Sequence, residues 1–323
     1  MAGDRPSAVL VLTNVHDVTA DVVLRILAER GVPVVRTDPG VDLHQGAALT
    51  TRYDTHGQRG TLTTASRSLD LGRVRSVWNR RPSVYRAPAG MEGQDAAFAR
   101  SQAHWGVGGI LSALPGAQYV NHPWRVREAE HKPTQLDTAL RSGLAVPATV
   151  ITTDPDQARA FCAAQPGGTV YKPLWNSPYT GDDGRAAQVW VSEVRPEEIT
   201  DAVAACPHLF QAKVDKAYDV RLTAVGERLF AVRIDSPDLD WRRRQDLVTY
   251  TRIGVPDGVA AAVARYLAAF GLVFGAFDFA VDQDGRWTFL ECNANGQWAF
   301  FPQLITDLIA EALADRLQRG TTP

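Results

Sequence analysis

Several features are scarce in this chain of 323 residues, and each scarcity excludes a class of protein. The three cysteines are widely spaced and form no disulfide framework or metal-binding pattern. Such cysteine usage predicts a reducing, cytoplasmic setting. The net charge of −2 gives no general attraction to nucleic acid or to an anionic membrane. No apolar run has the length of a membrane span, and the run 8–12 is too short for a signal-peptide core.

The amino-terminal part also lacks the glycine-rich fingerprint of dinucleotide-binding domains. A buried strand is expected at 8–13, a helix at 18–30 and a second strand at 32–36, and this order predicts a Rossmann-like half-domain. Residues 14–17, Asn-Val-His-Asp, replace the glycine turn, so no dinucleotide is expected here. The glycines at 106–109 fall inside an expected helix, and we interpret them as helix packing.

The rest of the chain alternates strands and helices without internal repeats. The periodicity predicts a central lobe and a third lobe, the third opening with a strand at 210–214 and a hairpin at 219–235 that turns at Gly226. The expected fold class is α/β with α+β lobes. The predicted lobes are an amino-terminal domain at 1–122, a central lobe at 123–208 and a carboxyl-terminal lobe at 209–323.

What the chain does have is a group of oxygen ligands on a hairpin near its end. Asp278 lies on one expected strand, and Glu291 and Asn293 lie on the next, pointing the same way because side chains alternate along a strand. A four-residue turn at 282–285 places Asp278 opposite Phe289, with Glu291 as a diagonal neighbour. Such a set suits Mg²⁺, which completes its shell with water and phosphate. The alternative is a polar hairpin face in water, which the crowding by apolar neighbours disfavours.

Two lysines of the central lobe are candidates for binding phosphate. Lys172 lies on an apolar strand between Val170 and Leu174, whereas Lys132 begins a helix and has the alternative of an ordinary surface lysine. The loop 177–184 that follows contains two glycines, whose backbone amides can fold over phosphate oxygens. Its two aspartates are unusual for such a role, so a plain hairpin loop stays open.

Arginines of the third lobe are candidates for stabilising a transferring group. Arg221 lies inside a strand on one face with Asp219, where an arginine usually meets an anion. An even turn places Arg233 on the opposite face, so the two arginines are not grouped. Arg242 belongs to the charge run 240–244, of which one arginine can stabilise a transferring phosphoryl group; the others are expected in solvent or against an acidic partner.

A further arginine pair ends a strand of the first lobe. Arg80 and Arg81 follow Trp78 and precede Pro82, at the carboxyl end of an expected strand in an open α/β lobe, where ligands tend to bind. A pair of this kind can hold a carboxylate or phosphate in bidentate fashion. The alternative is that both are solvated surface arginines.

The order of these residues along the chain resembles that of the ATP-grasp superfamily. The matching residues are Lys132, Lys172 with its glycine loop, 211–214, 219–221, Asp278 and 291–296. Four shorter strings narrow the resemblance to the ATP-grasp ribosomal peptide maturases, the graspetide synthetases. These strings lie at 78–82, 121–123, 240–242 and 289–298. With that subfamily the likeness covers nearly the whole chain, and it implies an ATP-grasp fold with a Rossmann-like amino-terminal domain, a central lid lobe and a carboxyl-terminal lobe.

The resemblance also implies roles for individual residues. It places ATP between the second and third lobes and Mg²⁺ on the hairpin. The arguments from charge and strand position given above predict Arg221 and Arg242 as catalytic residues and Arg80 and Arg81 as substrate-binding residues. Cys292 stands where an apolar residue is commoner, but it faces away from the metal side. The residues that the resemblance assigns to ATP are Lys132, Lys172, Gln211, Lys213, Val214 and Asp219, and those that it assigns to Mg²⁺ are Asp278, Glu291 and Asn293.

Enzymes of this subfamily activate Asp or Glu side chains of a ribosomal precursor peptide and join them to Thr, Ser or Lys of the same peptide. The resemblance therefore implies a ligase that forms macrocyclic esters or amides, with a precursor peptide as its partner. Two alternatives stay open, namely a ligase adding amino acids to a protein carboxyl terminus and an ATP-binding module without catalysis. Nucleic acid and membrane partners are not expected, and the sequence leaves a homodimer open.

Overall fold

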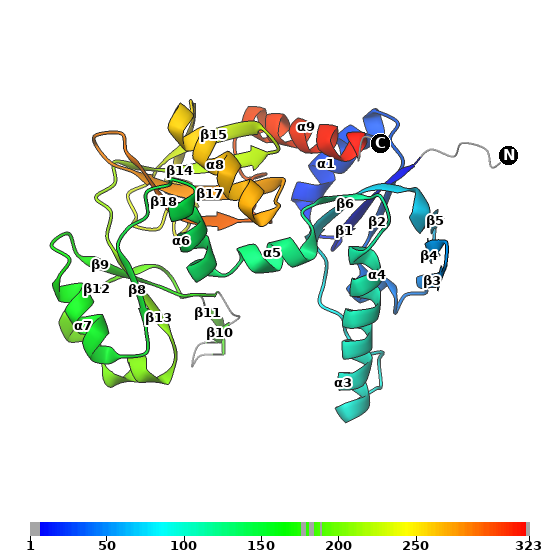
Figure 1. The fold of residues 1–323 in the computed structure, drawn as a ribbon, viewed down its shortest axis with the longest axis horizontal. Helices are drawn as coiled ribbons and strands as arrows, with labels where there is room; N and C mark the ends of the chain where they lie inside the picture. Colours follow the sequence, from blue (N-terminus) through cyan, green and yellow to red (C-terminus); the bar gives the residue numbers. More distant parts are fainter. Residues whose placement is uncertain (1–6, 176–178, 181–183, 188, 321–323) are drawn as a thin grey trace.

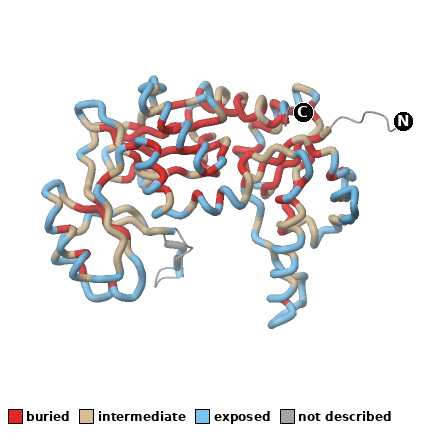
Figure 2. The backbone as a smooth tube through the Cα atoms, in the orientation of Figure 1, coloured by how far each residue is buried: buried red, intermediate tan, exposed pale blue. Residues whose placement is uncertain are grey.

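The computed structural model describes residues 7–175, 179–180, 184–187 and 189–320. Figure 1 shows the amino-terminal lobe at one end of an elongated molecule and the largest sheet at the other, with a smaller lobe below that sheet. The burial pattern in Figure 2 follows this division, because the buried residues concentrate in the two large sheets and in the helices that cover them. None of the helices in the described part of the chain is long and apolar enough to cross a membrane.

The first lobe is built on a four-stranded parallel sheet, which confirms the Rossmann-like expectation. The apolar run of β1 is buried along its whole length, and its alternate residues face two different clusters. Val9 and Val11 pack with α1 and α9, whereas Leu10 and Leu12 pack under the β3–β5 sheet and α4. The strands in order are β2 (Val34–Thr37), β1 (Ala8–Thr13), β6 (Val74–Arg81) and β7 (Gln118–Val120). The helices of this sheet are α1 (Val18–Glu29), α2 (Pro39–Asp42) and η1 (Leu71–Arg73).

The interpretation of the glycines at 106–109 as helix packing is confirmed only in part, because Gly108 lies against Tyr85 and the helix packs on the lobe core through Val107 and Ile110, whereas Gly106 and Gly109 face open space. Figure 1 shows the helix projecting away from the sheet. A Cβ atom placed on Gly106 or Gly109 would meet no atom within 4 Å, and Trp105 beside them is 74% exposed. The segment consists of α3 (Gly93–Gln102), η2 (Ala103–Val107) and α4 (Gly108–Ser112), and the small sheet nearby of β3 (Ala48–Asp54), β4 (Gly57–Thr63) and β5 (Ser68–Asp70).

The central lobe is a four-stranded antiparallel sheet with the order β12-β9-β13-β8. The third strand in this order, β13, was expected to open the carboxyl-terminal lobe. That expectation is wrong, because β13 pairs on both edges with strands of the central sheet, β9 and β8. The strands are β12 (Ser192–Val194), β9 (Thr169–Lys172), β13 (His208–Ala212) and β8 (Thr149–Thr152). The remaining elements are α5 (Pro123–Ala129), α6 (Lys132–Arg141), α7 (Pro155–Ala163), η3 (Pro196–Glu198), η4 (Asp201–Ala205), and the short pair β10 (Tyr179–Thr180) and β11 (Ala186–Ala187).

The third lobe is a five-stranded antiparallel sheet with the order β16-β15-β14-β17-β18. Arg221 of β14 pairs with Val232 and not with Arg233, which confirms that the two arginines face opposite sides. One face of the sheet carries α8, whose apolar residues pack on Phe277 and Phe279, and the sheet also contacts α9. The elements are β16 (Thr249–Ile253), β15 (Arg228–Asp235), β14 (Tyr218–Val225), β17 (Phe274–Val281), β18 (Trp287–Asn293), η5 (Gln245–Leu247), α8 (Asp257–Phe270) and α9 (Gln303–Arg319).

Candidate active site

The two hairpin carboxylates are direct cross-strand partners, because Asp278 of β17 pairs with Glu291 of β18. The expected register is therefore wrong. The loop has five residues, since Val281 pairs with Trp287, and an irregularity between Asp278 and Phe279 shifts the register by one further residue. A bulge of this kind redirects side chains locally. The two acids are closer neighbours than a regular hairpin with a four-residue turn allows.

The same bulge separates Glu291 from Phe289, which were expected on one face. Phe289 is fully buried among Phe277, Phe279 and Tyr266. Glu291 lies on the other side of the sheet, where it lines the cavities described below. Regular alternation fails at this point because one extra residue of β18, Leu290, lies between Glu291 and Phe289, the partners of two successive β17 residues.

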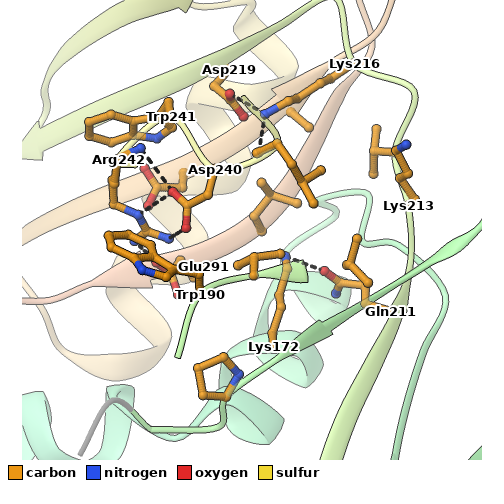
Figure 3. Close-up of a pocket in the computed structure, with 18 of the residues that line it drawn as sticks. Lys172, Trp190, Gln211, Lys213, Lys216, Asp219, Asp240, Trp241, Arg242 and Glu291 are labelled. Carbon is orange, nitrogen blue, oxygen red and sulfur yellow. Dashed lines mark hydrogen bonds and ion pairs between the residues drawn. The ribbon is translucent and has the colours of Figure 1, made fainter. Parts of the chain in front are cut away.

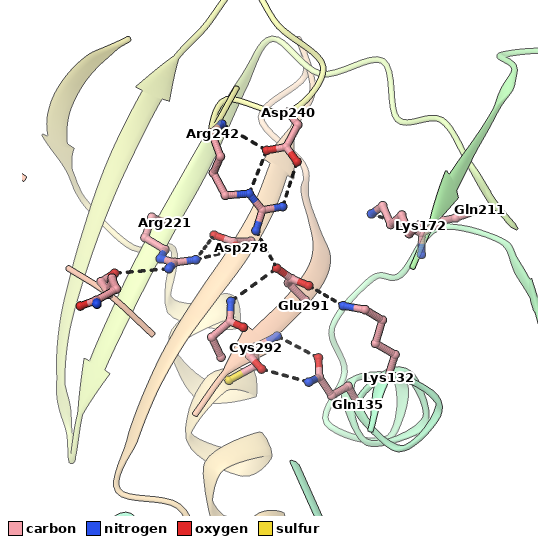
Figure 4. Close-up of polar contacts among 12 residues, drawn as sticks. Lys132, Gln135, Lys172, Gln211, Arg221, Asp240, Arg242, Asp278, Glu291 and Cys292 are labelled. Atoms are coloured by element: carbon pink, nitrogen blue, oxygen red, sulfur yellow. Dashed lines mark hydrogen bonds and ion pairs between the residues drawn. The ribbon is translucent and has the colours of Figure 1, made fainter. Parts of the chain in front are cut away.

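Glu291 is held by two cations from different parts of the chain, as Figure 4 shows. Its Oε2 atom accepts from Lys132 Nζ at 2.6 Å, and its Oε1 atom accepts from Arg242 Nη1 at 3.2 Å. Burial works against the carboxylate charge, but Lys132 and Arg242 outweigh it and hold the pKa of Glu291 well below its ordinary value. Asn293 Nδ2 also donates to Glu291 Oε1, at 3.4 Å.

Asp278 is paired with Arg221 of the neighbouring strand β14. The Nη1 atom of Arg221 donates to both carboxylate oxygens, at 2.7 Å each. Burial and the field of Glu291 raise the pKa of Asp278 above its ordinary value, against the opposite effect of Arg221. The two adjacent carboxylates therefore differ in their electrostatic environment, since two cations hold Glu291 and one holds Asp278.

Arg242 is positioned by Asp240, a residue that reasoning from the sequence did not single out. Arg242 Nε and Nη2 donate to the two oxygens of Asp240 at 2.8 and 3.1 Å. Although burial opposes the charge, the Asp240 hydrogen bonds and the field of Glu291 raise the pKa of Arg242 above its ordinary value. The available sequence signal was an aspartate two residues before the candidate arginine, within reach of its guanidinium.

A first cavity lies between the central sheet and the third sheet (Figure 3), and the residues expected to bind ATP line it. Lys172 Nζ donates to Gln211 Oε1 at 2.6 Å, and Lys213 Nζ lies 2.5 Å from Glu193. The free volume is about 100 Å³, which is below the ~300 Å³ at which ligand pockets typically begin. The residues of the prediction that line this cavity are Lys132, Lys172, Gln211, Lys213, Val214 and Asp219.

The ionisable side chains of the first cavity are strongly perturbed. Burial lowers the pKa of Lys172 to about 8, with partial compensation from Glu291. Burial raises the pKa of Asp219 to about 6, against the effect of Lys216, whose ammonium pairs with the Asp219 carboxylate. Perturbed pKa values of this kind concentrate at functional sites.

A second cavity of about 680 Å³ adjoins the first. Lys132, Arg242 and Glu291 line both cavities, so these three side chains lie where the two spaces meet. The second cavity also contains Arg81 and Arg221, together with aromatic walls from Trp175, Trp241 and Phe300. The cations in its lining outnumber the acids, which suits an anionic ligand.

The structure separates the two arginines that were expected to act as a clamp. Arg81 is exposed and lines the second cavity. Arg80 is 3% exposed, and its guanidinium donates to the backbone oxygen of Asn295 and to the side chain of Gln297. Because these acceptors occupy Nη1 and Nη2 of Arg80, its planar fork is not presented to a ligand in the way the clamp requires.

Two further features concern the surroundings of the hairpin. Gln135, which reasoning from the sequence missed, is buried on α6 and binds the backbone of Cys292 through both its donor and its acceptor, at 3.0 Å each. Its polar side chain one helical turn after Lys132, on the buried face of α6, was the available signal. The glycine loop at 177–184 lies largely outside the described residues.

Gly296, three residues after Asn293, is required by close packing. A Cβ atom there would lie 2.4 Å from the Cβ atom of Ala276, the cross-strand partner of Asn293. Real Cβ contacts are never so short, so any other residue would displace the end of β18 and with it Asn293.

The donor set fits a magnesium ion that carries nucleotide phosphates. Asp278 and Glu291 form one cross-strand pair, and Asn293 extends the set with an amide on the wall of the second cavity. Mg²⁺ takes one or two carboxylates and fills its shell with phosphate and water. Across the described parts of the chain, no group of three or more His, Cys, Asp or Glu side chains converges.

Comparison with protein families matches residues 8–127 to the MvdD pre-ATP-grasp domain. Comparison with curated proteins gives no match. Among solved structures, a RiPP-associated ATP-grasp ligase of Chryseobacterium gregarium, in complex with ADP and a leader and core peptide, has a TM-score of 0.88 and 23% identity over 98% of each chain.

Two macrocyclases of Microcystis aeruginosa MRC are also similar. MdnC, bound with precursor peptide MdnA, has a TM-score of 0.85 and 26% identity over 98% of this chain and 100% of that one. MdnB has a TM-score of 0.79 and 27% identity over 96% and 98%. The fold is therefore that of the ATP-grasp ligases, and the expected fold class is confirmed. Residues 8–127 therefore form a pre-ATP-grasp domain of the MvdD type, and the chain as a whole resembles the ATP-grasp maturases of ribosomally synthesised and post-translationally modified peptides (RiPPs).

Proposed function

We propose that the chain is an ADP-forming ligase that activates Asp or Glu side chains of a ribosomal precursor peptide and joins them to Thr, Ser or Lys of the same peptide. The observation that carries this proposal is the meeting of two cavities at Lys132, Arg242 and Glu291. A nucleotide in one cavity and a peptide in the other would place a terminal phosphate and a carboxylate on either side of these residues. Relatives crystallised with ADP and precursor peptides support this assignment.

On the nucleotide side, the proposal assigns the phosphates to Lys132 and Lys172. Lys172 is a half-buried ammonium whose hydrogen-bond partner in the protein is a neutral amide, so a phosphate is its natural counter-ion. Gln211, Lys213 and Val214, along the edge of the cavity, are assigned to the base and sugar. Because the cavity is narrower than a nucleotide, its walls must separate on binding.

Asp278, Glu291 and Asn293 would hold Mg²⁺ with the nucleotide. The ion would neutralise charge on the phosphates during transfer. Arg242, fixed by Asp240, lies beside Glu291 and is assigned to the charge that develops on the transferred phosphoryl group. Arg221 keeps Asp278 in place through its two hydrogen bonds.

On the peptide side, Arg81 and the aromatic walls of the second cavity are assigned to the substrate. A carboxylate oxygen of the peptide attacks the γ-phosphorus and releases ADP, which leaves an acyl phosphate. A hydroxyl or amine then attacks the acyl carbon, loses its proton and displaces phosphate. Each linkage removes one water in total, and the γ-phosphate carries away the carboxylate oxygen.

The proposed chemistry predicts a defined change in peptide mass. Purified enzyme, ATP, Mg²⁺ and a precursor peptide encoded beside the gene, with clustered Thr and Asp or Glu residues, should give a product lighter by one water per linkage. ADP and phosphate should appear in equal amounts. Mass spectrometry of the peptide and chromatography of the nucleotides measure both.

The same experiment separates the alternatives. A peptide that gains the mass of amino acids would indicate a ligase of the glutamate-adding kind. ATP binding without any peptide product would indicate a module without catalysis. Release of AMP and pyrophosphate would contradict the acyl-phosphate route.

Nucleotide binding should depend on pH through Lys172, whose pKa is about 8. A bound phosphate favours the charged lysine and raises its pKa in the complex. The complex therefore holds more protons than the free protein once the pH exceeds about 8, and the affinity for ADP should fall there by up to about tenfold per pH unit. Calorimetric titration across this range, in buffers of different ionisation enthalpy, measures the affinity and the proton uptake.

Two variants test that assignment. Lys172→Met should bind ADP more weakly and lose the pH slope. Lys213→Met is the matched control, because Lys213 lines the same cavity but pairs with Glu193, so the slope should persist. An unchanged slope in Lys172→Met would show that another group titrates.

A further inference from the structure

A buried polar network connects the amino-terminal lobe to the third sheet. It begins at Asp17, whose Oδ2 atom accepts from Thr13 Oγ1 at 2.7 Å and lies 3.6 Å from Arg80 Nε. Asp17 and Arg80 are 5% and 3% exposed. Arg80 continues the network through Nη1 to the backbone oxygen of Asn295 and through Nη2 to Gln297 Oε1.

Gln297 joins this network to the metal-side carboxylate. Its Oε1 atom accepts from Arg80 and also from Thr19 Oγ1, at 2.6 Å. Its backbone oxygen accepts from Arg221 Nη2 at 3.3 Å, and Arg221 Nη1 holds both oxygens of Asp278. A continuous series therefore runs from Asp17 to Asp278, made of the Asp17–Arg80 ion pair, hydrogen bonds and covalent bonds.

The cost of this arrangement indicates that it does more than join two lobes. Burying a guanidinium carries a large desolvation penalty, and apolar residues of similar volume usually hold two surfaces together at least as well. Burial accordingly lowers the pKa of Arg80 to about 10, with partial compensation from Asp17. What an apolar side chain cannot do is fix the orientation of backbone carbonyls and amides in the segment 295–297.

The strand β6 itself offers a comparison. Arg75 lies at its other end and also connects the amino-terminal lobe to the carboxyl-terminal part, donating to the backbone oxygens of Ser7 and Gln318 at 2.9 and 2.8 Å. Arg75 does not line either cavity at the active site, whereas Arg80 lines the second cavity. Arg75 and Arg80 both lie on β6 and both donate to backbone oxygens. They differ in location, because the acceptors of Arg80 line the second cavity and those of Arg75 do not.

We propose that Arg80 is a positioning residue for the metal site. By fixing the segment 295–297, it sets the orientation of Arg221 and thereby the position at which Asp278 presents its oxygens. This inference rests on the proposed function, because it takes Asp278 as a metal ligand. It replaces the expected role of Arg80 as a substrate clamp.

The test measures metal binding separately from turnover. Mn²⁺ affinity is measured by electron paramagnetic resonance, in the presence of saturating ADP, for the full chain and for Arg80→Met and Arg75→Met at equal folded fraction. Arg80→Met should weaken Mn²⁺ binding and lower kcat by at least about tenfold, with metal-free ADP affinity unchanged. Arg75→Met should lower thermal stability but keep both values. Arg80→Lys should recover only part of the loss, since one ammonium does not reproduce the planar fork.

Two outcomes would overturn the inference. The first is Mn²⁺ affinity and kcat in Arg80→Met equal to those of the wild type, which would make Arg80 a connection between lobes only. The second is an absence of Mn²⁺ binding in the wild type with ADP, which would also overturn the proposed function. If Arg80→Met does not fold, Gln297→Ala removes the shared acceptor and should reproduce the loss of metal affinity; retained affinity would contradict the proposal.

Discussion

Glu291→Gln should reduce ligase turnover by about a thousandfold or more, which corresponds to about 4 kcal/mol of transition-state stabilisation. The substitution keeps the shape of the side chain but removes the carboxylate that lies at the junction of the two cavities. Metal binding in the presence of ADP should weaken in parallel, because a neutral amide is a poor substitute for a carboxylate ligand.

Metal-free ADP should bind to Glu291→Gln no more weakly than to the wild type. In the wild type, Glu291 holds Lys132 at 2.6 Å and Arg242 at 3.2 Å. Without this carboxylate, both cations lose a competing acceptor and remain available to phosphate. Calorimetry with ADP, with and without Mg²⁺, and turnover measured by mass spectrometry give the three values.

Glu311→Gln is the matched control for this experiment. Glu311 also pairs with an arginine, Arg30, but does so on α9 outside both cavities. It should keep turnover and metal affinity. Full turnover in Glu291→Gln would remove Glu291 from the metal site, and weaker metal-free ADP binding would show that the carboxylate organises the lysine and arginine for phosphate.

Arg221→Met should destabilise the fold by about 3 to 5 kcal/mol, the range for breaking a buried ion pair on one side. The side chains of Arg221 and Asp278 are 6% and 9% exposed, so water cannot replace the lost partner. The Asp278 carboxylate would remain buried beside Glu291 with its main counter-ion removed. Urea unfolding of the variant and the wild type measures the difference.

A second substitution tests whether the uncompensated charge is the cause. Adding Asp278→Asn to Arg221→Met removes that charge and should restore a large part of the stability, while turnover stays absent. The coupling energy between the two sites then follows from the four stabilities. A double variant that is no more stable than Arg221→Met would show that lost packing against Trp241, and not the charge, explains the effect.

The sequence allowed the fold to be predicted where the signal was local. The buried run of β1, the helix α1 and the turn of the β14–β15 hairpin were predicted from apolar periodicity and glycine positions. The assignment of β13 failed because pairing partners are set by contacts between distant segments, and a strand of mixed polarity fits either of two sheets. The local sequence pattern of a strand does not indicate which sheet that strand joins.

In the candidate site, too, residue types and spacing could be read from the sequence, whereas strand pairing and burial could not. Asp278, Glu291 and Lys132 were chosen for their residue type and spacing, and the structure brings them to the same wall of the cleft. The role of each residue stays a prediction. The bulge that pairs the two acids could not be predicted from the sequence. A strand with one extra residue looks like a regular strand until the residues that it pairs with are known. The sequence could not show that Arg80 is buried and Arg81 exposed, because the burial of each side chain depends on which distant segment of backbone packs against it.

The last long helix of the chain completes the core of its first sheet. Ile309 and Leu313 of α9 share a buried cluster with Val9 and Val11 of β1, and Figure 1 shows α9 beside α1. A ribosome adding 5–20 residues per second delivers α9 about 15 to 60 s after β1. During this interval, one apolar face of the nascent first lobe remains uncovered, the kind of surface that chaperones bind. The first lobe to be synthesised is therefore completed only together with the third lobe, which packs on the same helix.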